Sequence, residues 1–141
     1  MEKEHQEIES TLLETIGRLT KIKEERLNLV LEEKELSKPI LHDINLVGNI
    51  YDLFMSSFDG KSTMWRRKMF IFVVLYLYSP SALAGTKMRR GLRYKIASVL
   101  GCTCSNVSHD YKNVRFFYTT YKAFRMHVNN SLSLILSKWQ K

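Results

Sequence analysis

The sequence predicts an all-α protein with a long N-terminal helix of coiled-coil pattern followed by a small helical domain. The 141 residues include only six glycines and two prolines, which favours helices over a turn-rich β fold. The charge of the chain changes sign near residue 38, where the coiled-coil pattern also ends. Residues 1–38 carry seven Lys/Arg and ten Asp/Glu, whereas residues 39–141 carry fifteen Lys/Arg and four Asp. We therefore expect a helical association segment at 1–38 and a basic helical domain at 39–141.

Residues 2–37 predict one helix, because they contain no proline, one glycine and many Glu, Lys, Leu and Ile residues. A heptad register runs through them, and six of its ten seam residues are apolar. One seam position holds Ile8, Thr15, Ile22, Leu29 and Leu36, and the other holds His5, Leu12, Leu19, Arg26 and Glu33. We expect a partner helix, parallel or antiparallel, to associate through Leu12, Leu19, Ile22, Leu29 and Leu36. Packing of this stripe on the chain's own domain is the alternative.

A second, short helix is expected over residues 40–58, where apolar residues recur at helical spacing. Pro39 ends the first helix, because the residue before a proline is disfavoured in the helical region. Residues 59–62 predict a turn, after which Ser62 or Thr63 caps the next helix.

Residues 64–78 predict a buried core helix. The unbroken apolar run Met69–Tyr78 is too short for a membrane span, which needs about 20 residues. Arg66, Arg67 and Lys68 stand at the start of this helix, where cations oppose the helix dipole. We expect another group to favour them there, and phosphate is one candidate.

Residues 92–114 predict two short helices joined by a tight turn, the layout of a helix-turn-helix. The first helix has an apolar face made of Leu92, Ile96, Val99 and Leu100. Gly101 can end it in a left-handed conformation, and Thr103 or Ser105 can cap the second helix. Val107, Tyr111 and Val114 fall at helical spacing in that second helix. A short helix from Ser79 or Ser81 is expected in the connecting segment before this motif.

The spacing of Ala97, Gly101, Val107 and Ser108 resembles the helix-turn-helix of bacterial and phage DNA-binding regulators. Over residues 92–114 the chain is most similar to the lac-repressor-type family. Residues 64–120 resemble, more loosely, the DNA-binding domain of replication initiators. Asp110 departs from the pattern, because an apolar residue is more usual there, and it places a negative charge on the reading helix. The resemblance implies a motif at 93–114 whose recognition helix, about 104–115, lies in the major groove.

The resemblance also implies which side chains contact DNA. The residues implied to read bases are Thr103, Cys104, Ser105, Asn106, Ser108, His109 and Lys112. Among these, Asn106 suits adenine, and Lys112 or His109 suits guanine. The residues expected to bind phosphate are Arg66, Arg67, Lys87, Arg89, Arg90, Arg93, Lys95 and Arg115. A polyanionic partner is also expected from charge alone, because Asp110 is the one acidic residue among fifteen basic ones from Lys61 onward.

The C-terminal segment, residues 115–139, predicts helices that close the core. Its aromatic residues lie between basic ones, so a stacking surface for single strands is an alternative to a core face. The expected core face consists of Phe117, Tyr121, Phe124 and Val128. Residues 129–131 are expected to cap a last helix, which contributes Leu132, Ile135, Leu136 and Trp139.

The predicted function is a non-enzymatic DNA-binding protein, a transcriptional regulator or other accessory factor of DNA transactions, with duplex DNA favoured over RNA. The paucity of acids after residue 60 argues against carboxylate-based hydrolysis. No cofactor or metal is expected, since Cys102, Cys104 and His109 lack a fourth ligand. Free thiols and no visible leader indicate a cytoplasmic, nucleic-acid-associated protein. One alternative is a helical interaction protein whose head reads no DNA. Another is membrane association through Met69–Tyr78, although this apolar run is too short to span a membrane.

Overall fold

The computed structural model describes residues 1–57 and 63–139, and every regular element in these ranges is a helix. The predicted all-α class, with its long N-terminal helix, is therefore confirmed. The chain divides into two compact units, Met1–Leu36 and Ser37–Lys141. The division falls two residues before the boundary expected at residue 38.

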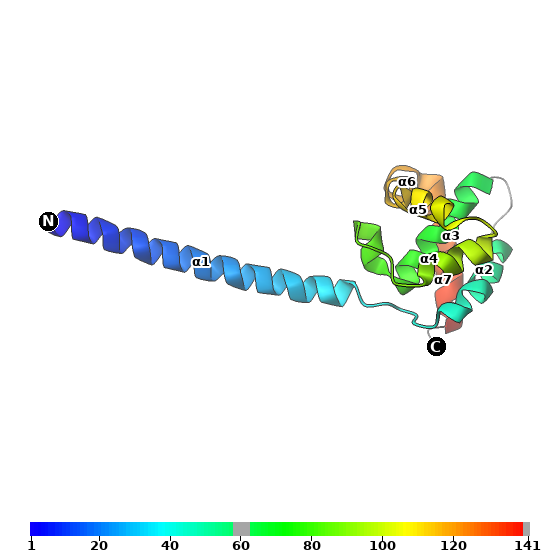
Figure 1. The fold of residues 1–141 in the computed structure, drawn as a ribbon, viewed down its shortest axis with the longest axis horizontal. Helices are drawn as coiled ribbons and strands as arrows, with labels where there is room; N and C mark the ends of the chain where they lie inside the picture. Colours follow the sequence, from blue (N-terminus) through cyan, green and yellow to red (C-terminus); the bar gives the residue numbers. More distant parts are fainter. Residues whose placement is uncertain (58–62, 140–141) are drawn as a thin grey trace. The chain divides into compact units, whose positions relative to one another are not determined.

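The first unit is the single helix α1, Glu2–Leu36 (Figure 1). It continues without a break through Gly17, and the hydroxyls of Thr15 and Thr20 donate to the carbonyls of Thr11 and Ile16. At 1.5 Å per residue its 35 residues extend over roughly 52 Å. Every residue of α1 is exposed, including the whole apolar seam.

The second unit, hereafter the head, is built around α3, Thr63–Tyr78. Helix α3 packs against α2, α4, α5, α6, α7 and η2, and it passes through the middle of the head in Figure 1. The surrounding elements are η1 (Ile44–Leu46), α2 (Val47–Ser56), η2 (Pro80–Ala84), α4 (Leu92–Leu100), α5 (Cys104–Tyr111), α6 (Val114–Thr120) and α7 (Lys122–Trp139).

Helix α3 is the predicted core helix. Within the run Met69–Tyr78 only Tyr76 is exposed, and all other side chains are buried. A helix that is apolar on every face must be covered on every face, which explains why five helices surround it. Within residues 1–57 and 63–139, no helix is both long and apolar enough to cross a membrane.

The second helix begins later than expected, at Val47 instead of residue 40. The N–H groups of Ile40 and Leu41 both donate to the carbonyl of Leu77, at 2.9 Å each, and these bonds hold the segment against the end of α3. The helical path starts only after Asp43, whose carboxylate accepts from the N–H of Asn45 and caps η1. The turn expected at 59–62, with its capping residue Ser62, lies outside the described residues.

The prediction that a last helix starts at residues 129–131 is wrong, because α7 runs through them without interruption. Ser131 is buried, and its Oγ lies 2.8 Å from the Oγ of Ser57, so a tertiary contact uses the hydroxyl expected to cap. Phe124 and Val128 are fully buried, as predicted. Phe117 and Tyr121 lie instead at the edge of the core, with ring centroids 6.1 and 5.3 Å from that of Trp65.

Candidate nucleic-acid interface

The turn between α4 and α5 forms as the sequence predicts. Gly101 ends α4 with φ of 68°, a left-handed conformation that side chains disfavour, and the N–H of Cys102 donates to the carbonyl of Ala97 at 3.0 Å. Thr103 is extended and caps α5, because its Oγ1 accepts from the N–H of Asn106 at 3.2 Å. These local bonds fix where α5 begins.

Apolar side chains hold the two helices on the core. Leu92 and Ile96 of α4 and Val107 of α5 are fully buried, and the small Ala97 is 5% exposed where the helices approach each other. Val114 is buried too, but it belongs to α6. Helix α5 ends at Tyr111, four residues earlier than the recognition helix expected at about 104–115.

Asp110 does not add a negative charge to the outer face of α5, contrary to the expectation from its sequence position. Its side chain is 2% exposed and points into the head. There it lies 3.0 Å from Nζ of Lys68, and Nε of Arg67 donates to its second oxygen. The carboxylate takes a position that usually holds an apolar residue, because two cations from α3 neutralise it.

The same contacts explain why basic residues stand at the start of α3. In the structure the guanidinium of Arg67 pairs with the carboxylate of Asp110, and its role in phosphate binding stays a prediction. Lys68 is buried as well, and its ammonium also lies 3.3 Å from Oδ1 of Asn113 and 5.2 Å from the ring centroid of Phe117. These interactions tie the end of α5 to α3, so they fix which face of α5 points outward.

Three adjoining hollows surround the outer face of α5, with volumes of about 340, 360 and 300 Å³. The first and second share Arg93 and Ser108, the first and third share Tyr111, and the second and third share Lys112. We call them together the basic groove. The lining includes six Lys and Arg residues and no Asp or Glu; the cations are Lys87, Arg89, Arg90, Arg93, Lys112 and Arg115.

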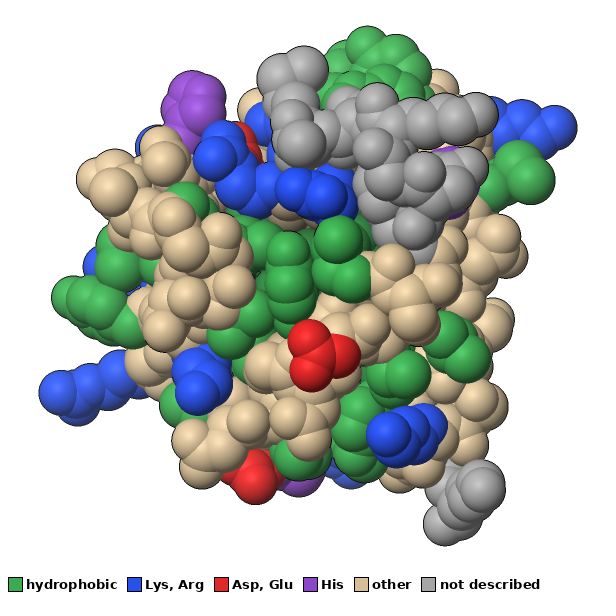
Figure 2. Space-filling view, turned by 90° about the vertical axis from the view of Figure 1, so that its right-hand side faces the viewer, with side chains coloured by type: hydrophobic (Ala, Val, Ile, Leu, Met, Phe, Trp, Pro, Cys, Tyr) green, Lys and Arg blue, Asp and Glu red, His purple; other side chains and the backbone are tan. Residues whose placement is uncertain are grey.

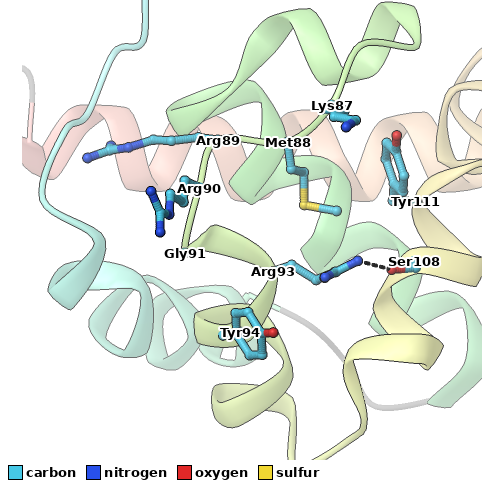
Figure 3. Close-up of a pocket in the computed structure, with 9 residues that line it drawn as sticks. All are labelled: Lys87, Met88, Arg89, Arg90, Gly91, Arg93, Tyr94, Ser108 and Tyr111. Atoms are coloured by element: carbon cyan, nitrogen blue, oxygen red, sulfur yellow. Dashed lines mark hydrogen bonds between the residues drawn. The ribbon is translucent and has the colours of Figure 1, made fainter.

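Figure 3 shows the part of the groove between the 87–94 segment and α5. One guanidinium nitrogen of Arg93 donates to Oγ of Ser108 at 3.0 Å and so bridges α4 to α5. Arg89 reaches away from α5, and its guanidinium donates to the carbonyl of His42 at 2.6 Å. By contrast, Figure 2 shows a face of the molecule on which basic, acidic and hydrophobic side chains are interspersed.

The structure brings together most of the predicted contact residues. Of the predicted base-reading residues, Cys104, Ser105, Ser108, His109 and Lys112 line the groove. Asn106 is exposed on α5 outside this lining, and the hydroxyl of Thr103 is engaged in the helix cap. The predicted phosphate residues Arg66 and Lys95 are partly buried and do not line the hollows.

Two tyrosines in the groove were not predicted as site residues. Tyr111 lines two of the hollows, and its hydroxyl donates to the carbonyl of Thr86 at 3.4 Å, although its spacing suggested only core packing. Tyr94 is 66% exposed beside Arg93, whose guanidinium carbon lies 5.7 Å from the ring centroid. Their place among basic residues was the available signal, because aromatic rings between cations are typical of nucleic-acid surfaces.

The two cysteines at the turn are free thiols. Burial raises the pKa of the Cys102 thiol, with Arg67 opposing this shift and Asp110 and Cys104 adding to it, so this thiol stays protonated near neutral pH. Across the described parts of the chain, no three His, Cys, Asp or Glu side chains cluster in a way that could hold a metal ion.

Comparisons with protein-family models, with curated proteins and with solved structures found no match for this chain. The geometry and charge of the basic groove are therefore the features of the head that point to a function.

Proposed function

We propose that the head binds duplex DNA, with α5 presented to the major groove and the basic groove holding the flanking phosphates. The observation that carries this proposal is the lining of the groove. It holds six Lys and Arg side chains, from residues 87–90, α4, the C-cap of α5 and α6, and no carboxylate. Such a one-signed surface attracts polyanions, and neutralising the phosphates of DNA releases counterions, which supplies much of the binding affinity.

The outer face of α5 has the chemistry for reading bases. Ser105, Asn106 and His109 are exposed on it and can donate or accept hydrogen bonds at base edges. The major groove is about 12 Å wide and admits one α-helix. Arg90 and Arg115 line different hollows of the basic groove, and we assign both to contacts with DNA phosphates beside α5. The proposed role is regulation of transcription or another accessory role in DNA transactions.

The test is a fluorescence-anisotropy titration of the full chain against a random-sequence duplex at roughly 50 and 200 mM salt. The guanidinium of Arg89 already donates to His42, which leaves five cations for phosphate. With five contacts at a slope of about −0.9 each, affinity should fall by about 500-fold between these concentrations. The test variant Arg90→Ala/Lys112→Ala/Arg115→Ala should bind more weakly, with a log–log salt slope shallower by about 2.7, or about 0.9 for each lost contact.

A matched control removes the same charge elsewhere. Lys3→Ala/Lys21→Ala/Lys34→Ala takes three exposed cations from α1, outside its heptad seam. This variant should keep the wild-type slope. An equal loss of affinity in both triple variants would show that binding depends only on the net charge of the protein. Absence of binding at the lower salt concentration would overturn the proposal.

A second candidate function follows from α1. Its seam residues Leu12, Leu19 and Leu29 are each more than half exposed, and an apolar stripe of this length is typical of a helix that pairs with a partner. Under this alternative the protein is an interaction module, and the head reads no DNA. Partner binding that persists at high salt, together with no duplex binding by the head, would favour it.

A further inference from the structure

The seam of α1 lies on one unbroken helix, Glu2–Leu36, and polar residues stand at four of its ten positions. Each residue of the seam can therefore be assigned an opposite residue for each orientation of a second helix. His5, Leu12, Leu19, Arg26 and Glu33 occupy heptad position a, and Ile8, Thr15, Ile22, Leu29 and Leu36 occupy position d.

A parallel pair of two copies in register would bring like charges together. In that arrangement each seam residue faces itself, so Arg26 would face Arg26 and Glu33 would face Glu33 inside the seam. Arg18, at position g, would also flank Lys23, at position e of the next heptad. Like charges at facing positions destabilise a coiled coil, and this arrangement has them at several levels.

An antiparallel pair removes these clashes from the seam. Positions a then face positions d of the other copy, and full overlap matches residues whose numbers add to 41. The facing pairs are Leu12 with Leu29, Leu19 with Ile22, Arg26 with Thr15, Glu33 with Ile8, and His5 with Leu36. Each pair occurs twice in the dimer, so Leu12–Leu29 and Leu19–Ile22 together give four layers in which apolar side chains meet. Neither Arg26 nor Glu33 meets its own charge.

We propose that α1 pairs with α1 of a second copy of this chain as an antiparallel two-stranded coil. A second copy suits the seam, because in the antiparallel orientation apolar residues face apolar ones in four layers and like charges do not face each other in the seam. The two Leu36 residues would then lie at opposite ends of the coil, 31 residues apart along it, or roughly 46 Å. Each end would lead into one head. Given the proposed function, on which this consequence alone rests, one dimer would bridge two separate DNA segments.

The orientation is tested by disulfide capture in the full chain. One protein carries Leu12→Cys and a size tag, and another carries Leu29→Cys without the tag. Each is oxidised alone and in an equimolar mixture, with the parent chain, which has Cys102 and Cys104, as the control. Sedimentation of the reduced variants checks that each still forms dimers. We expect a tagged–untagged disulfide product in the mixture and no increase above the parent when either variant is oxidised alone.

The other outcomes overturn the proposal. Strong self-linkage of each variant alone would show a parallel pair, and monomers in sedimentation would show that α1 does not pair with itself. None of these measurements uses DNA, so they stand whether or not the head binds a duplex. Bridging has its own readout, the retention of a labelled duplex on an immobilised one, and its failure together with successful disulfide capture would count against the DNA proposal alone.

Discussion

Replacing Asp110 with alanine should strongly destabilise the head, because it would leave the ammonium of Lys68 buried without its carboxylate. The Lys68 side chain is 8% exposed and lies 3.0 Å from Asp110, whose side chain is 2% exposed. Breaking a buried pair in this way costs about 3–5 kcal/mol. Asn113 and the ring of Phe117 still contact Lys68, and Arg67 is 35% exposed and can turn toward water. We therefore expect the lower end of the range, about 3 kcal/mol.

The assay is equilibrium urea unfolding followed by tryptophan fluorescence. Both tryptophans, Trp65 and Trp139, belong to the head, so the signal reports the head and not α1. A loss of about 3 kcal/mol would lower the urea midpoint by about 1 M or more. In a thermal melt it would lower Tm by roughly 12–24 °C, at about 4–8 °C for each kcal/mol in a domain of this size.

Two further variants separate this mechanism from a general effect of losing an acid. Asp52→Ala removes an exposed carboxylate from α2 and should change the free energy of unfolding by no more than about 0.5 kcal/mol. Lys68→Met/Asp110→Leu removes both charges and should recover most of the lost stability, since apolar replacements of buried pairs are often neutral or better. A loss below about 1 kcal/mol for Asp110→Ala would refute the reasoning.

Two other predictions concern the end of α3 and the seam of α1. Burial raises the pKa of Tyr78 from 10.0 to about 12, with Asp43 adding to the shift and Arg89 opposing it. The protonated Tyr78 hydroxyl therefore contributes stability that is complete below pH 10 and is lost as pH rises through 12. Urea midpoints of wild type should therefore fall more steeply between pH 9 and 11 than those of Tyr78→Phe, and parallel falls would contradict the assignment. Leu12→Lys should shift sedimentation toward monomer. Leu13→Lys should not, because Leu13 lies outside the seam, although its side chain is similarly exposed, at 63% compared with 56% for Leu12. Equal shifts for the two variants would argue against pairing through the seam.

Local stereochemistry and capping account for the features that could be predicted from sequence. The ten-residue apolar run predicted the buried helix α3, because no face of such a helix can remain in water. Gly101 and Thr103 predicted the end of α4 and the start of α5, since a left-handed glycine and a capping hydroxyl act within a few residues. The charge asymmetry predicted the basic surface, and most predicted contact residues line the groove.

Features that depend on distant partners were decided only by the tertiary structure. The role of Asp110 depends on Lys68 and Arg67, 42 and 43 residues earlier, and no local pattern could show that a carboxylate would be buried at an apolar position. The late start of the second helix depends on the hydrogen bonds from Ile40 and Leu41 to the carbonyl of Leu77. The continuity of α7 depends on the burial of Ser131, whose hydroxyl pairs with that of Ser57. A sequence pattern records what each segment prefers in isolation. Packing decides which polar groups are desolvated, and each desolvated group then requires a partner that only the assembled fold supplies.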